Sequence, residues 1–438
     1  MAAPEHSTNS VSKVLNDAPM GAMQIFIITL LVMLNALDGF DVLAITFAAP
    51  GISEDWVISR SALGVVIAAN VIGAGASVFL APMADRIGRR PTILVSLVIM
   101  TVGMLLTAFV SSLTTLMACR LLTGLGVGLM IPSLTAVAAE FSNNRRRDLA
   151  VSAMTIGFPL GGLIGGFVAA DIVEAAGWRA IFTAGGLATA AFIPLVWFGL
   201  PESPEYLAAR GGPDALTKIN AILKRLGHSL VDEARATEMK RESADPRELL
   251  GPGLRMLTVL LISAYFLHIM AFYFFSGWTP KILTDAGYTQ SAAIATSAIT
   301  SMGGVTGGIF VGLASAYFGL KRLAVISMVG TSVLMAVFAM NTGDLFILRI
   351  VAFVLGIFTM GGIVGLYAFL ARAFPARLRV TGCALAVAIG RAGGVVGPVL
   401  GGVLLDAGMN ASTVLTAIGA TATLGALFLL RVQLKDEG

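Results

Sequence analysis

Residues 23–49 read MQIFIITLLVMLNALDGFDVLAITFAA, an apolar run with few polar side chains. A helix needs about 20 residues to cross the hydrocarbon core of a bilayer, so this run is long enough to span a membrane. Two carboxylates, Asp38 and Asp41, lie in its second half. Because ionisable side chains inside a membrane are costly and normally face a cavity or a partner, the run predicts a membrane helix that carries functional acids.

The composition of the whole chain supports the same interpretation. Of its 438 residues, 57% are hydrophobic and 12% are charged, and the mean hydropathy is +0.88. Soluble globular chains carry roughly a quarter charged residues, so most of the surface of this chain is expected to face lipid. Long apolar runs favour helices over a β-barrel, whose strands would be short and alternating. The sequence predicts an all-α polytopic membrane protein.

Twelve apolar runs are long enough to be membrane helices. They cover residues 23–47, 58–81, 92–111, 113–139, 149–172, 179–199, 254–276, 290–314, 322–340, 344–370, 380–405 and 410–431. Between the sixth and seventh runs lies one polar segment of mixed charge. The predicted organisation is a disordered cytoplasmic tail (1–22), a six-helix bundle (23–200), a central cytoplasmic loop (201–253), a second six-helix bundle (254–432) and a short tail (433–438).

Basic residues in the short loops indicate the orientation. If the N-terminus is cytoplasmic, the loops on that side carry Arg86, Arg89, Arg90, Arg145, Arg146, Arg147, Lys321, Arg322, Arg372, Arg377 and Arg379, and the opposite loops carry Arg60, Arg179 and Lys281. Lys and Arg accumulate in cytoplasmic loops. We therefore expect a multi-pass protein of the cell (inner) membrane with both termini cytoplasmic. The same topology explains the net charge of +4, so no binding of nucleic acid is expected.

The two halves of the chain resemble each other. ADRIGRRP at 84–91 aligns with AYFGLKRL at 316–323, and Arg120 aligns with Arg349 at nearly the same displacement. Repeats of six spans are a transporter architecture, with the substrate site between the halves near the bilayer midplane. The predicted fold is twelve transmembrane helices in two pseudo-symmetric six-helix bundles.

Three motifs resemble those of the major facilitator superfamily, and the resemblance covers essentially the whole chain. APMADRIGRRP at 81–91 is similar to its loop signature, RLLTGLGVG at 120–128 to its Arg-x-x-x-Gly-x-Gly-x-Gly pattern, and PESPEYL at 201–207 to a turn in several of its families. The signature usually opens with Gly, where this chain has Ala81, and the second copy lacks the acid. The gate that this loop forms in the family is therefore expected to be asymmetric.

Within the superfamily, two further motifs resemble those of the aromatic acid:proton symporters, namely Asp-Gly-Phe-Asp at 38–41 and GRAGGVVGP at 390–398. The resemblance implies a secondary active transporter that imports a small aromatic carboxylate, of the benzoate, hydroxybenzoate or phenylpropionate type, with protons by alternating access. Its implied partners are the aromatic acid anion, protons and the lipid bilayer, and a monomer is expected. No nucleotide-binding loop, catalytic triad or metal-ligand cluster is found in the sequence, so we expect neither an enzyme nor a cofactor or metal.

Asp38 and Asp41 are the candidates for proton coupling. They lie one helical turn apart on one face, and a rise of about 1.5 Å per residue puts them at the depth of Arg120 in the fourth span. One acid is expected to pair with Arg120 while the other binds and releases a proton, and the sequence leaves open which does which. The alternative is an ion pair that only locks the two spans together.

Five residues are candidates for substrate binding. Arg391 lies near the middle of the eleventh span, and its guanidinium can hold a carboxylate by two parallel hydrogen bonds; a lock to the other half is the alternative. Phe272 and Tyr273 suit stacking on a benzene ring. His268 and Asn35 complete the set, although a lone histidine in an apolar helix is as often bonded only to a neighbour.

The resemblance also implies a gate at the cytoplasmic ends of the helices, formed by Asp85, Arg86, Arg89, Arg90 and Glu140; for the arginines, topology is the alternative explanation. Two rival functions remain at this stage. One is a symporter or exporter of another organic anion or drug with the same architecture. The other is a transporter-like receptor that binds aromatic acids, and uptake of labelled acid separates it from a transporter.

Overall fold

The structure is a computed structural model that describes residues 11–80, 86–232, 246–341, 343–375 and 378–432. Its long helices are α2 (Ala22–Trp56), α3 (Arg60–Ala76), α5 (Arg89–Ala108), α6 (Leu113–Glu140), α7 (Arg147–Gly199), α10 (Arg255–Asp285), α11 (Gln290–Phe318), α12 (Leu320–Met340), α13 (Leu345–Ala373), α14 (Arg379–Gly390), α15 (Gly393–Asp406) and α16 (Ala411–Arg431). Its short helices are α1 (Val11–Asp17), η1 (Ser77–Leu80), α8 (Pro204–Arg210), α9 (Ala215–Leu226) and η2 (Pro246–Leu250).

The helices account for twelve membrane crossings. Eleven stretches of the described residues are helical, long enough and apolar enough to cross a membrane. One of them, α7, has 53 residues, or about 80 Å at the usual helical rise, against a hydrocarbon core of about 30 Å. Gly177 interrupts it with a φ of 74°, outside the helical region. Because α7 is thus two helices joined at a bend, the prediction of twelve spans is confirmed.

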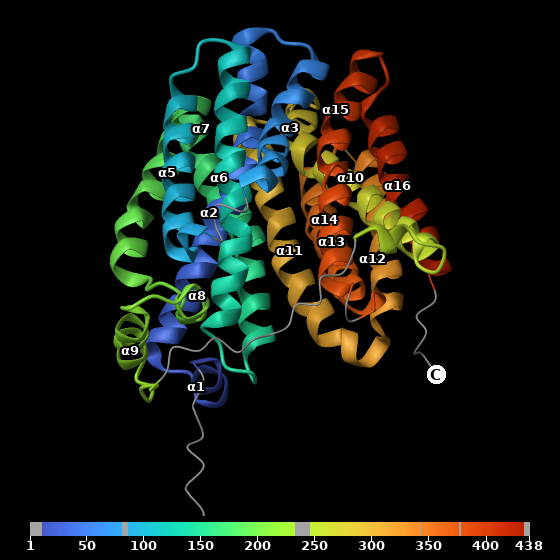
Figure 1. Ribbon diagram of the computed structural model, residues 1–438. Helices are drawn as coiled ribbons and strands as arrows, with labels where there is room; N and C mark the ends of the chain where they lie inside the picture. The colour runs from blue at the N-terminus through green and yellow to red at the C-terminus, as the bar shows by residue number, and fades with distance from the viewer. Residues whose placement is uncertain (1–10, 81–85, 233–245, 342, 376–377, 433–438) are drawn as a thin grey trace, which may run out of the picture.

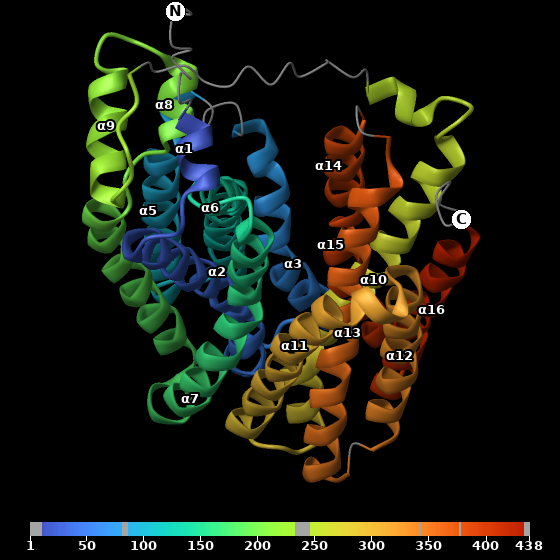
Figure 2. The same cartoon turned by 90° about the horizontal axis from the view of Figure 1, so that it is seen from below.

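The crossings form two bundles that lie side by side. In both Figure 1 and Figure 2 the helices from α2 to α7 occupy one half of the molecule and those from α10 to α16 the other. We call the end that carries α1, α8 and α9 the terminal face, and the opposite end, where α2 and α10 finish, the distal face. This arrangement confirms the predicted fold class of two six-helix bundles.

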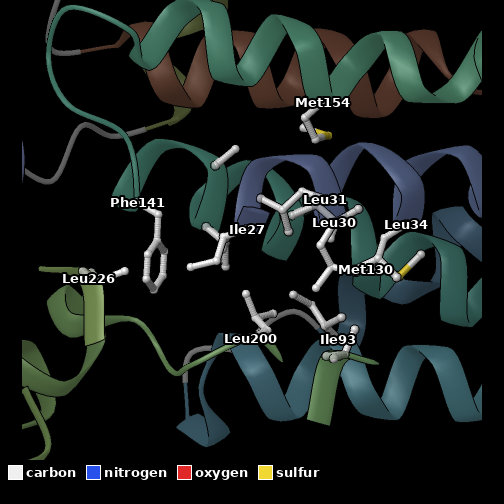
Figure 3. Packing of buried hydrophobic residues seen from close by; sticks show 14 of the residues in the cluster. Ile27, Leu30, Leu31, Leu34, Ile93, Met130, Phe141, Met154, Leu200 and Leu226 are labelled. Atoms are coloured by element: carbon white, nitrogen blue, oxygen red, sulfur yellow. The ribbon is translucent and has the colours of Figure 1, made fainter. Parts of the chain in front are cut away.

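Apolar packing holds the first bundle together near the terminal face. Figure 3 shows Ile27 and Leu31 of α2 among the side chains of neighbouring helices, with Ile93, Met130 and Phe141 nearby. These five side chains are completely buried. Burying such a residue stabilises a fold by about 1.5–3 kcal/mol, so this cluster fixes α2, the helix that carries both acids.

The expectation of a disordered N-terminal tail is wrong for residues 11–17, which form α1. Val11, Val14 and Leu15 follow helical spacing and are buried in the same apolar cluster. Asn143 donates its side-chain N–H to the carbonyl of Ala18 at 2.9 Å. This part of the tail is ordered because its three apolar side chains pack into the apolar cluster of the first bundle.

The two bundles are joined at the distal face. The carboxylate of Asp406, at the end of α15, accepts hydrogen bonds from the backbone N–H groups of Arg60 and Ser61 at 2.9 and 2.7 Å. These two residues begin α3 in the other bundle, and the Arg60 guanidinium also pairs with Asp285 of α10 at 3.3 Å. Farther in, a Cβ at Gly64 would lie 2.4 Å from the carbonyl oxygen of Pro398, so the backbones of α3 and α15 touch.

The predicted eleventh span, residues 380–405, is not one continuous helix. It is divided into α14 and α15 at Arg391 and Ala392. The chain tightens there, because Ala392 donates to the carbonyl of Ile389 at 3.0 Å, three residues back. Short tightened turns inside helices often mark functional hinges. The physical reason lies in the flanking glycines, which bring the backbone against α10: a Cβ at Gly390 would lie 2.0 Å from the ring of Tyr265.

Candidate functional site

The predicted contact between the first and fourth spans is present. The Arg120 guanidinium of α6 donates to Oδ1 of Asp41 in α2 at 3.1 Å, and both side chains are buried. Arg120 also donates to the hydroxyl of Thr107 at 2.9 Å and lies over the ring of Phe182, 4.8 Å from its centroid. Asn70 of α3 donates to the second oxygen of Asp41 at 3.3 Å. This ion pair is therefore held by three further side chains.

Asp38 lies one turn away and is arranged differently. Its side chain is completely buried, and neither carboxylate oxygen has a hydrogen-bond partner among the described residues. The charged groups that act on it are Asp41 in its own helix and Arg391 in the other bundle. A carboxylate without a partner inside a membrane protein is unfavourable as an anion. Binding of a proton or of a nearby cation would therefore stabilise Asp38.

Arg391 lies in the second bundle at the break between α14 and α15. Its guanidinium lies within electrostatic range of the hydroxyl of Tyr367 in α13. Tyr265 of α10 in turn donates its hydroxyl to that of Tyr367 at 3.0 Å. Tyr273, one of the predicted substrate residues, packs its ring against Gly394 and lies within electrostatic range of both Arg391 and Asp38. Arg391 thus lies near three phenol rings and within electrostatic range of Asp38 in the first bundle.

A pocket lies beside this charged centre, between the bundles. Its cavity volume is about 30 Å³. Phe272 lines it, and the Phe272 and Tyr273 rings meet edge to face with centroids 5.1 Å apart. The pocket is lined by Leu43, Phe158, Pro159, Phe272, Phe275, Ser276, Thr279, Ser297, Thr300, Ser301, Gly304, Thr359 and Met360. Its wall therefore comes from both bundles and joins the charged centre through Phe272 and Tyr273.

The other two predicted substrate residues make contacts between helices. Asn35 donates its side-chain N–H to the carbonyl of Met154 at 2.7 Å, which ties α2 to α7. His268 is buried, and its Nε2–H donates to the carbonyl of Thr359 at 2.9 Å, which ties α10 to α13. Since Thr359 also lines the pocket, His268 holds part of the pocket wall in place. A direct role of either residue in substrate binding stays a prediction.

At the terminal face, the predicted gate residues form a network within the first bundle. Glu140 at the end of α6 lies 3.7 Å from the guanidinium of Arg89. Arg90 lies over the ring of Trp197, 5.2 Å from its centroid, and the carbonyl of Arg86 accepts from the hydroxyl of Tyr206 at 2.7 Å. Asp85 lies outside the described residues.

Sequence reasoning missed several members of these networks. Glu202 accepts from the backbone N–H groups of Arg89 and Arg90 at 3.0 and 3.3 Å, so it caps the start of α5. The motif PESPEYL contains Glu202, yet its role depends on a helix start far away in the chain. Asn70 and Tyr367 were missed as well. Each is a polar side chain with apolar neighbours in a membrane span, and that pattern could have indicated both residues.

The sequence is also similar to those of known proteins. The sequence model of the family described as Major Facilitator Superfamily matches residues 31–315 and 261–437. The gallate transporter of Pseudomonas putida is 32% identical over 422 residues, which cover 95% of this chain and 93% of that protein. The 4-hydroxybenzoate transporter PcaK of Pseudomonas aeruginosa is 29% identical over 98% of this chain and 97% of that protein.

Among solved structures, the xylose transporter XylE of E. coli in a partially occluded inward open conformation superposes with a TM-score of 0.77. The match covers 95% of this chain and 99% of that chain at 19% sequence identity. At this level of identity the likeness concerns the fold, and it agrees with the two bundles of Figure 1.

Proposed function

This chain belongs to the major facilitator superfamily, and within it to the aromatic acid:proton symporters, and from that premise we propose that it imports a small aromatic carboxylate together with a proton. We place it in the cell (inner) membrane as a monomer, with both termini and the terminal face cytoplasmic. The rival roles, an exporter of another anion or a receptor that does not transport, are outcomes of the tests below.

One observation carries the proposal: a buried acid without a hydrogen-bond partner, Asp38, lies within electrostatic range of a partly buried base, Arg391, in the other bundle. Asp38 and Arg391 act on each other electrostatically, and Arg391 lies beside the aromatic side chains of α10. A guanidinium is suited to hold a carboxylate by two parallel hydrogen bonds. We propose that the substrate carboxylate binds Arg391 while its ring lies against Phe272 and Tyr273.

The charges then couple the substrate to a proton. In the empty site, the Asp38 anion and the Arg391 cation sum to zero. When a substrate anion binds Arg391, it neutralises the positive charge that Asp38 faces, and the buried carboxylate becomes more stable with a proton. By linkage, the proton strengthens substrate binding as much as the substrate strengthens proton binding. The loaded site is again neutral, so we propose one proton per substrate anion.

Uptake into proteoliposomes tests this function. We expect labelled 4-hydroxybenzoate to accumulate when the interior is alkaline, and accumulation to collapse with a proton uncoupler. One proton per anion is electroneutral, so an imposed membrane potential should leave accumulation unchanged. A second proton would move one net charge and add about 2.3 kcal/mol of driving force per 100 mV. Binding without uptake would favour the receptor, and uptake that ignores the pH gradient would contradict symport.

Arg391→Lys is expected to weaken recognition of the carboxylate. Lysine keeps the charge but loses the planar pair of donors, and a hydrogen bond between charged groups contributes about 1.5–3 kcal/mol. The KM for uptake should therefore rise about ten- to hundredfold, while the maximal rate changes less. Arg349→Lys, in α13 and outside the site described above, is the matched control and should keep the wild-type KM. An unchanged KM in Arg391→Lys would refute this assignment.

Alternating access requires the bundles to separate at the distal face. We propose that residues 23–200 and 254–432 move as two bodies connected by residues 201–253. The contacts of Asp406 with the start of α3 would break in each cycle, because they join the two bodies. They hold the distal face closed in the conformation described here.

Asp406→Ala is expected to open the distal face. Loss of a carboxylate at a helix start costs about 1 kcal/mol, which shifts the ratio of closed to open about fivefold. Distances between spin labels on the distal ends of α3 and α15 should then show a larger long-distance component. Asp344→Ala is the control, since Asp344 caps α13 within its own bundle through Phe346 and Ile347. If both variants leave the distances at their wild-type values, Asp406 is not part of the closure.

A further inference from the structure

We propose that the pocket beside the charged centre is a subsite for the hydroxyl groups of the substrate ring. This inference rests on the proposed function, and it adds that the chain selects hydroxylated aromatic acids over unsubstituted ones. Six of the residues that line the pocket carry hydroxyl groups, and these are Ser276, Thr279, Ser297, Thr300, Ser301 and Thr359. They come from α10, α11 and α13, so one bundle supplies the whole polar wall.

The hydrogen bonds of these side chains orient the wall as an acceptor surface. Thr279 donates its hydroxyl to the carbonyl of Phe275 at 2.6 Å, Thr300 donates to Thr296 at 3.1 Å and Thr359 to Leu355 at 3.0 Å. A hydroxyl group has one proton to donate and two lone pairs to accept with. Because each of these three hydroxyl groups donates its proton to a carbonyl of its own helix, it can only accept a hydrogen bond from a group in the pocket. A group that donates a hydrogen bond, such as a phenol, is the complement of such a wall.

Ser297 is the pocket residue whose hydroxyl lacks a hydrogen-bond partner. It is buried, with 8% of its surface exposed, and its hydroxyl has no hydrogen-bond partner among the residues that the structure describes. Leaving a buried hydroxyl unpaired is unfavourable. A ring hydroxyl in the pocket would supply the missing partner, and this is the second, independent observation behind the subsite.

The position and size of the pocket suit one edge of a ring. Leu43 lines it from α2, five residues beyond Asp38, which is about 7.5 Å along the helix. The cavity volume of about 30 Å³ holds about two waters. Two hydroxyl groups on a ring whose carboxylate is held by Arg391 would replace those waters. The ring itself would lie against Phe272, between the two ends.

Competition against labelled 4-hydroxybenzoate uptake in proteoliposomes tests the subsite. The competitors are benzoate, 4-fluorobenzoate, which can only accept, 4-hydroxybenzoate and 3,4,5-trihydroxybenzoate. Each hydrogen bond gained should improve the inhibition constant about two- to tenfold. We therefore expect the hydroxylated acids to inhibit more strongly than benzoate, and 4-fluorobenzoate to resemble benzoate.

Ser297→Ala and Thr300→Val should reduce this preference, because they should weaken inhibition by the hydroxylated acids more than inhibition by benzoate. Thr306→Val is the matched control, because Thr306 lies in the same helix, donates to Met302 in the same way and is exposed; it should keep the wild-type preference. Ser297→Ala should also be at least as stable to heat as the wild type, since it removes an unpaired buried hydroxyl. A merely structural serine would instead lower stability and weaken all acids alike.

The outcomes separate this inference from the proposed function. Equal inhibition by benzoate and the hydroxylated acids, stronger inhibition by 4-fluorobenzoate than by 4-hydroxybenzoate, or an unchanged preference in both variants would overturn the subsite alone. Absence of uptake of every aromatic acid would overturn the proposed function, and the subsite with it.

Discussion

Asp38→Asn is expected to exchange aromatic acid across the membrane without accumulating it. Asparagine has nearly the size of the acid but binds no proton. The side chain at position 38 is then always neutral, as protonated Asp38 is in the loaded site, so the substrate anion can bind Arg391 without a proton. Uptake against a gradient should fall to the equilibrium level under an alkaline interior. Exchange of labelled for unlabelled acid at equal concentrations should continue, because it needs no net movement of protons.

The pH dependence of substrate affinity tests the role of Asp38 independently of the uptake assay. In the wild type, substrate binds together with a proton, so its affinity should fall as pH rises. In Asp38→Asn the affinity should be nearly independent of pH. Asp55→Asn is the matched control, since Asp55 lies in the same helix but at the distal end, half exposed and paired with Arg179; it should accumulate substrate normally. Accumulation by Asp38→Asn, or a wild-type pH dependence of its binding, would contradict the assignment.

The sequence predicts the fold and the depth of the site because both follow from regular geometry. Apolar runs set the number of spans, and a constant helical rise sets the level of each residue in the membrane. This reasoning places Asp38, Asp41 and Arg120 at one level, and the Asp41–Arg120 contact is found at 3.1 Å. It does not choose between the two acids, which share a helix face and differ by one turn. That choice depends on how α2 and α6 are rotated against each other.

Contacts between distant segments explain what the sequence did not predict. Tyr367 and Tyr265 lie 102 residues apart, and their hydroxyl contact beside Arg391 leaves no local pattern. Asp406 caps a helix that begins 346 residues earlier. Only the packed bundles bring these partners together, so no spacing rule could have named them.

The two bundles share an architecture, but the roles proposed for them differ. In the first, Asp38 is the proton-binding candidate, and the Asp41–Arg120 pair stays neutral beside it. In the second, Arg391 and the hydroxyl wall are the proposed binding site of the substrate. Arg349 aligns with Arg120, but only Arg120 forms the described ion pair with a buried acid, Asp41. The Nε atom of Arg349 is buried and has no hydrogen-bond partner among the described residues. The repeat therefore predicts the helices of each half and not the chemistry placed on them.

Breaking the Asp41–Arg120 pair from either side is expected to destabilise the protein more than any other change proposed for this site. Arg120→Met leaves a buried carboxylate without its cation, and Asp41→Leu leaves a buried guanidinium without its anion. Removing one partner of a buried pair typically costs about 3–5 kcal/mol. The double variant Asp41→Leu/Arg120→Met should recover much of that loss, because neither buried charge remains. Unfolding in detergent micelles measures the four proteins as a double-mutant cycle.

The exposed pair between Asp55 and Arg179 is the matched control, since it also joins α2 to another span of the same bundle, at 2.9 Å. Exposed pairs contribute below about 1 kcal/mol, so its cycle should give a far smaller coupling energy. Equal coupling in the two pairs would contradict a buried, structural role for Asp41 and Arg120. The double variant also decides between the acids: if Asp38 binds the transported proton, any folded double variant should still accumulate substrate, whereas loss of accumulation with intact exchange would assign the proton to Asp41.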